Sequence, residues 1–161
     1  AGDVRTSGWS IRQVLRTSPS DLVALLSQMA RGRLVDEWSS NEMIALLEAD
    51  RYNTLLPEPL PDNVAIAHKT GSLFDTLNDA GIVYAADSPY VIAIMTTALP
   101  SKDLGRAFIH KISRLAYVDE LRYGRWRAAM GISPAFAPAS RRGDGGSPDV
   151  PYWNDDGPPT R

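Results

Sequence analysis

The sequence predicts an α+β fold in which two helices precede a three-stranded antiparallel sheet and a long helix follows it. Apolar residues recur at helical spacing in the first third of the chain, three short apolar runs occupy the middle, and helical spacing returns after Pro100. The chain has 161 residues, of which 43% are hydrophobic and 22% are charged, so we expect one domain with a substantial core.

The first helix is predicted from its capping residues. Ser18 is a candidate N-cap, Pro19 suits the first helical position, and Asp21 stands three residues after the cap. Gly32 is expected to end the helix. Its buried face should consist of apolar residues at helical spacing, namely Leu22, Leu25, Leu26 and Met29.

The second helix is expected to begin at Ser39. Ser39 and Glu42 have the spacing of a capping box, in which each side chain caps the backbone near the other. The three prolines of the sequence NTLLPEPLPDN then end the helical pattern. The apolar stripe of this helix should be Met43, Leu46 and Leu47.

Three consecutive antiparallel strands are predicted near residues 63–70, 80–87 and 90–98. The sequence GSLFDTLND should form a long loop between the first two strands, and the triplet DSP should form the turn between the last two. Lys69 is expected at the end of the first strand, at the edge of the sheet.

The terminal helix is predicted near residues 102–118, packed across one face of the sheet, and the pattern allows it to continue to Met130. The domain division expected is a loop segment over 1–16, a folded part over 17–130 and a tail over 131–161. The tail holds six of the twelve prolines and few apolar residues, so it is expected to lack stable structure of its own.

Composition narrows the classes of function. The absence of cysteine excludes thiol chemistry and cysteine-ligated zinc, and the two histidines lie far apart in sequence, so no metal or other cofactor is expected. A net charge of −2 gives no reason to expect a nucleic-acid partner. No run of about 18 apolar residues suggests a membrane span.

The most informative motif is the triplet Lys69-Thr70-Gly71 followed by Ser72. Taken alone, such a short match occurs by chance, and Lys69 could simply be a solvated residue at a strand end. Its setting, after two helices and before a hairpin and a long helix, resembles the C-terminal part of the class A β-lactamase and penicillin-binding serine hydrolase family. The resemblance runs from about Thr17 to Tyr123.

Within this resemblance, Asn78-Asp79 is similar to the Asn-Asp pair that opens the family's next strand. The resemblance implies that Lys69 supplies positive potential for a substrate carboxylate and that the Thr70 hydroxyl bonds nearby. Gly71 would let substrate approach the strand, and the Ser72 backbone N–H would match one oxyanion-hole donor.

Two further motifs of the family are missing from this chain. Neither Ser-x-x-Lys, which carries the nucleophile, nor Ser-Asp-Asn occurs. The Ser39-Ser40-Asn41 sequence has a similar form, but helix capping explains it better. No catalytic residue is therefore assigned to this chain, which is expected to be inactive alone.

Two functions remain open. The chain could be the C-terminal part of a serine hydrolase acting on β-lactams or related acyl-peptides, with the nucleophile outside it, or a non-catalytic module that binds cell-wall material or a protein. An unrelated α+β domain would match the motif by chance. By resemblance alone we expect an extracytoplasmic location, and an N-terminal half or second chain paired with strand 90–98.

Overall fold

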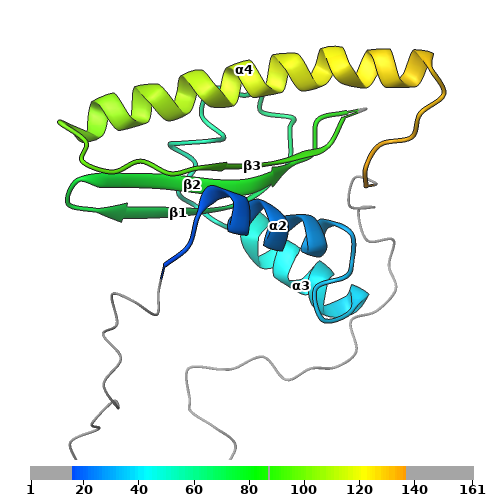
Figure 1. Cartoon of the computed structure of the whole chain (residues 1–161), viewed down its shortest axis with the longest axis horizontal. Coiled ribbons are helices and arrows are strands. Elements are labelled where there is room, and N and C mark those ends of the chain that lie inside the picture. The colour runs from blue at the N-terminus through cyan, green and yellow to red at the C-terminus, as the bar shows by residue number, and fades with distance from the viewer. Residues whose placement is uncertain (1–15, 87, 137–161) are drawn as a thin grey trace, which may run out of the picture.

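The computed structural model describes residues 16–86 and 88–136. In this part of the chain the elements follow in the order α2, α3, β1, β2, β3 and α4, and the predicted α+β class is confirmed (Figure 1). Their bounds are Pro19–Ala30 for α2, Glu37–Glu48 for α3, Ile66–Leu73 for β1, Thr76–Val83 for β2, Tyr90–Ile94 for β3 and Lys102–Ala129 for α4. The predicted segment 1–16 and most of the predicted tail lie outside the described residues.

The predicted capping of α2 is confirmed. The Ser18 hydroxyl accepts a hydrogen bond from the Asp21 N–H at 3.2 Å, and the Asp21 carboxylate accepts one from the Ser18 N–H at 2.9 Å. Both ends of the capping box are therefore present. Gly32 follows the helix with a φ of 67°, a left-handed conformation that glycine adopts without steric cost.

The predicted cap of α3 is wrong by three residues. Asp36, not Ser39, is the N-cap, and its carboxylate accepts a hydrogen bond from the Ser39 N–H at 2.7 Å. A carboxylate is at least as good a cap as a hydroxyl and also interacts favourably with the helix dipole, so the helix extends back to include Glu37.

The described sheet has the order β1-β2-β3, with both neighbouring pairs antiparallel as predicted. The predicted long loop between the first two strands is wrong, because Leu73 pairs with Thr76 across a two-residue turn. Gly71, Ser72 and Asn78 are poor strand formers in isolation, yet all three lie in paired strands. The second strand ends at Val83, earlier than predicted.

Helices cover both faces of this sheet, as Figure 1 shows. Helices α2 and α3 pack on one face, and α4 crosses the other. The cluster on the α2 and α3 side contains Leu26, Met29, Ile44, Ala67, Ala80 and Ile82. The clusters on the α4 side contain Leu55, Leu56, Leu77, Ile94 and Ile109, and then Leu60, Val83, Ala85 and Tyr90.

Helix α4 begins at a Ser101 N-cap and continues for 28 residues, as the sequence pattern allowed. A Cβ at Gly105 would lie 3.5 Å from the Leu77 Cβ on β2, which is ordinary contact, so the first turn of α4 packs on the sheet at this position. Within the described residues, no helix combines the length and the apolar character needed to cross a membrane.

Candidate functional site

The predicted site residues lie on β1, which forms one edge of the described sheet. In an antiparallel pair, backbone groups point alternately toward and away from the neighbouring strand. The Tyr84 N–H donates to the Ala65 carbonyl at 3.0 Å, which fixes the phase of this alternation. By the register of β1 and β2, the backbone groups of His68, Thr70 and Ser72 therefore point away from β2, toward the open edge.

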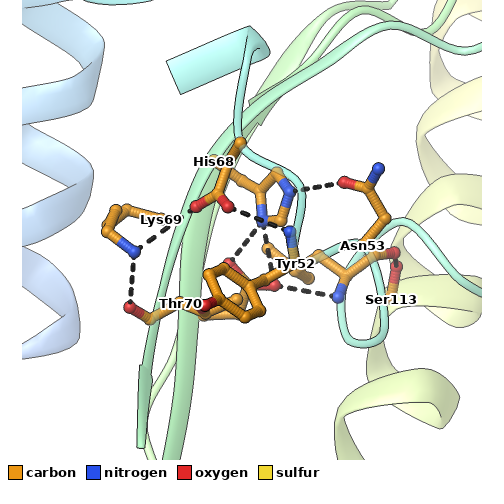
Figure 2. A network of polar contacts seen from close by, with 9 residues as sticks. Tyr52, Asn53, His68, Lys69, Thr70 and Ser113 are labelled. Carbon is orange, nitrogen blue, oxygen red and sulfur yellow. Dashed lines mark hydrogen bonds and ion pairs between the residues drawn. The ribbon is translucent and has the colours of Figure 1, made fainter. Parts of the chain in front are cut away.

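Lys69 lies in the middle of β1, so the prediction that it ends the strand is wrong. Its Nζ is 3.4 Å from an Asp50 carboxylate oxygen and donates to the Thr70 carbonyl at 3.2 Å (Figure 2). The Lys69 side chain is 65% exposed, so the contact with Asp50 is weak and leaves the ammonium accessible. The lysine is thus an available positive charge beside outward-pointing backbone groups.

Asp50 is itself held in place, just after α3. One of its carboxylate oxygens accepts the Tyr52 N–H at 3.0 Å. This hydrogen bond, and secondarily Lys69, lowers the pKa of Asp50 below its ordinary value. The acid is therefore ionised at neutral pH and directs Lys69 along the β1 edge.

His68 points to the opposite face of β1 from Lys69, as expected from strand alternation. It is 1% exposed, and its Nδ1 lies 3.0 Å from an Asp79 carboxylate oxygen while its Nε2 lies 3.1 Å from the Asn53 side-chain oxygen (Figure 2). Asp79 also accepts the Leu56 N–H at 3.0 Å. This buried network joins β1 and β2 to the segment that carries Asp50.

Gly81 makes room for the histidine. A Cβ at position 81 would lie 2.7 Å from the His68 Cβ and 2.6 Å from the Ala67 carbonyl oxygen. Real Cβ atoms do not approach so closely, so the position opposite His68 requires glycine. The glycine is thus part of the structural support for β1.

Gly71 has no such internal reason. The nearest neighbour of a Cβ built there is the Asn78 Cβ at 3.9 Å, which is ordinary van der Waals contact. Packing within the described residues would therefore tolerate a side chain at this position. Its absence leaves the strand open to close approach by another molecule.

Ser72 is exposed near the end of β1, and its backbone N–H points away from β2 by the alternation above. Its hydroxyl accepts a hydrogen bond from Lys102 Nζ at 2.9 Å. Lys102 Nζ also donates to the Thr76 carbonyl, so the lysine is bound to the hairpin backbone as well. Ser72 and Lys102 do not have the Ser-x-x-Lys spacing of the family's nucleophile, so no nucleophile is assigned to this contact.

The middle residue of the Ser39-Ser40-Asn41 sequence on α3 has a structural role. Ser40 is fully buried, and its hydroxyl donates to the carbonyls of Leu34 and Asp36 at 2.9 and 2.7 Å. It also accepts the Leu34 N–H at 3.2 Å. Ser40 fixes the connection between α2 and α3. It is the middle residue of the sequence, so the interpretation of Ser39 and Asn41 as non-catalytic stays a prediction.

The buried network was not predicted from the sequence. Asn53 lies in a proline-rich connection and Asp79 lies 11 residues from His68, so no local spacing brings them together. Asp79 belonged to the predicted loop GSLFDTLND, so the usable signal was His68, whose strand position places it on the face opposite Lys69.

Two helices on one face of an antiparallel sheet, a long helix on the other and a Lys-Thr-Gly edge strand define the class as a β-lactamase-like fold. A sequence profile described as the Beta-lactamase enzyme family matches residues 5–119. This chain belongs to that family. No curated protein matches the chain.

Solved structures of the family agree with this assignment. PBP-A is 32% identical, with a TM-score of 0.60 over 64% of this chain and 39% of its own. A class A β-lactamase from Bacteroides cellulosilyticus DSM 14838 is 26% identical, with a TM-score of 0.59 over 65% and 41%. The extended-spectrum β-lactamase TLA-1, at 23% identity and a TM-score of 0.61 over 65% and 41%, shares the fold.

The chain thus spans about two fifths of the length of these relatives. It has the C-terminal part of their fold, as the sequence predicted.

Proposed function

We propose that this chain is the C-terminal part of a serine hydrolase that acts on β-lactams or related acyl-peptides. The observation that carries the proposal is the β1 edge, where an accessible Lys69 ammonium lies in the same strand as an outward-pointing Ser72 N–H. A related mutant of PBP-A is described as an acyl-enzyme complex with penicillin G. That structure is 32% identical to this chain over the matched region.

In this proposal each site residue has one role. Lys69 attracts the substrate carboxylate, and the Thr70 hydroxyl bonds to the same group. Gly71 lets the substrate lie against β1. The Ser72 N–H donates to the oxyanion that develops when serine attacks the acyl carbon, a contact worth about 3 kcal/mol in comparable enzymes.

The nucleophile has to come from a polypeptide segment outside the 161 residues, because Ser-x-x-Lys is absent here. We propose that this segment, an N-terminal half or a second chain, pairs with β3, which ends at Ile94 and not at the predicted residue 98. The acylated serine and its base would then lie opposite β1. By family resemblance we place the assembly outside the cytoplasm.

The alternative is a non-catalytic module that binds cell-wall material or a protein. The missing Ser-x-x-Lys favours this second function if no upstream segment supplies the motif. The sequence preceding Ala1 separates the two functions, since a Ser-x-x-Lys there supports the enzyme.

The test is covalent labelling by a fluorescent penicillin, read by intact mass. The chain alone should form no adduct, because it lacks an activated nucleophile. Affinity-tagged chain isolated from its native cells should carry the label on a polypeptide segment containing Ser-x-x-Lys, and Lys69→Met should reduce that labelling at least tenfold. An unlabelled native assembly would overturn the enzymatic proposal, and a label on a serine of residues 1–161 would show that the nucleophile is misplaced.

A further inference from the structure

Lys102, the first residue of α4, connects that helix to the β1–β2 hairpin. Its Nζ donates to the Ser72 hydroxyl at 2.9 Å and to the Thr76 carbonyl at 2.5 Å, and it also donates to the Leu73 carbonyl. An ammonium has three donors, so these three acceptors satisfy it completely. Leu73 and Thr76 are the pair that closes the hairpin turn.

The position is an unfavourable one for a lysine. The N-terminus of a helix carries the positive end of its dipole, and a cation there is typically destabilising. Asp103, the next residue, is the type expected in a first turn. The three contacts with the hairpin offset this cost and explain why a lysine can occupy the position.

Little else holds the tip of the hairpin. Leu73 and Phe74 are 74% and 99% exposed, so hydrophobic burial does not fix the turn. Among the described residues, the Leu99 N–H also donates to the Asp75 carbonyl at 2.9 Å, and the Thr96 hydroxyl accepts the Leu77 N–H at 3.0 Å, but neither contact involves Ser72. Lys102 is therefore the contact that acts directly on Ser72.

The contact matters because of where Ser72 points. Its side chain shares the α4 face of the sheet with its register partner Leu77, while its backbone N–H points to the open edge of β1. The contacts hold the Ser72 side chain and the Leu73 carbonyl, which belongs to the following peptide, so they limit movement of the strand end that carries the Ser72 N–H. They also keep one positive charge next to that N–H.

We propose that Lys102 is a positioning residue, which holds the Ser72 N–H toward the β1 edge and adds positive potential where the oxyanion develops. The effect of Lys102 on the oxyanion rests on the proposed function. The holding of the β1–β2 hairpin by Lys102 can be tested without any substrate.

The structural test is amide hydrogen exchange on the full chain, with each variant compared in the same form as the wild type. Lys102→Met should raise exchange of the amides over 71–77 at least tenfold and change those over 80–83 less than twofold. Lys102→Arg keeps the charge and should retain most of the protection. Lys111→Met, at an exposed position on the same helix, should have no effect.

Hairpin exchange within twofold of the wild type in Lys102→Met would overturn the positioning role, as would an equal increase over both segments. In the labelling-competent native assembly, the acylation rate constant of Lys102→Met should fall about tenfold, with the dissociation constant for unreacted penicillin within twofold. If amide exchange over 71–77 rises in Lys102→Met while the acylation rate constant is unchanged, Lys102 positions the hairpin but does not assist acylation. An assembly that never acylates would refute the proposed function and leave the hairpin result standing.

Discussion

The two edges of the described sheet differ in how their backbone groups are used. At β1 the charged side chain of Lys69 lies between residues whose backbone groups point outward. Its Nζ already donates to one of these groups, the Thr70 carbonyl. At β3 the five residues Tyr90–Ile94 are apolar apart from one phenol hydroxyl, and the register directs the N–H groups of Val91 and Ala93 outward.

The difference indicates two kinds of recognition. A polar edge with an accessible cation suits a small anionic ligand that bonds to a few backbone groups. A short apolar edge with free backbone groups suits another strand, and unprotected edges of this type associate readily. This difference favours the proposed binding of substrate at β1 and of a polypeptide at β3, and the following changes test that proposal.

The largest expected effect concerns pairing along β3. Ala93→Pro removes an outward N–H without removing a bond to β2, because proline is tolerated at the open side of an edge strand. We expect this variant to stay folded and to lose association with its partner segment, measured as mass in solution by light scattering.

Ile92→Pro is the matched control, since its N–H points toward β2 and its loss should unfold the sheet. Association of Ala93→Pro equal to that of the wild type would show that the partner does not pair along β3. A wild-type chain that is a cooperatively folded monomer with strongly protected amides over 90–98 would also show that no partner pairs along β3.

The next effect concerns the support beneath β1. Asp79→Ala leaves the His68 imidazole and the Leu56 N–H without their shared acceptor in a fully buried site, so the free energy of unfolding should fall by about 3 kcal/mol. Asp79→Asn keeps an acceptor for Leu56 and should lose about 1 kcal/mol. Urea denaturation measures both values, and equal stability of the two variants would contradict the network's importance.

The smallest effect is a pair of opposite pH dependences beside β1. The Tyr52 N–H lowers the pKa of Asp50, so its stabilising contribution is present above its ordinary pKa of 3.8 and is lost as pH falls through the lowered value. Burial raises the pKa of Glu48 above 4.5, so its contribution is present in acid and is lost as pH rises through the raised value.

Glu48→Gln should therefore stabilise the chain at pH 7 by roughly 0.3 kcal/mol, a small value because the group is largely solvated. Asp50→Asn should weaken the loss of stability between about pH 4 and pH 2. Urea titrations at several pH values measure the free energy of unfolding of both variants. A lower stability of Glu48→Gln at pH 7, or an unchanged loss of stability of Asp50→Asn in acid, would contradict these pKa directions.

The sequence predicted the helices and the antiparallel order well, because their signals are local. Ser18 and Asp21 cap α2 as expected, and α4 continues for 28 residues, as the sequence pattern allowed. The strand ends were predicted poorly, since Gly71, Ser72 and Asn78 disfavour strands until a neighbouring strand and α4 hold them. A single-sequence pattern contains no information on such tertiary contacts.

The candidate site divides in the same way. The motif Lys69 to Ser72 could be found from the sequence because its four residues are consecutive. The roles of these residues in substrate binding stay proposals. Asp50, Asn53 and Lys102 contact Lys69, His68 and Ser72 of β1 from 19, 15 and 30 residues away. Their pairing depends on where α3 ends and where α4 begins, so only the assembled fold brings them to β1.

The two-residue turn between Leu73 and Thr76 has a consequence for the order of folding. Because β1, β2 and β3 are adjacent in sequence as well as in space, their pairing requires only short loop closures. Hairpins of this kind form in about 1–10 μs, far faster than two chains meet at cellular concentrations. We therefore expect the meander to be complete when a partner strand arrives, so that the arriving strand adds to a finished template and the encounter sets the rate of assembly.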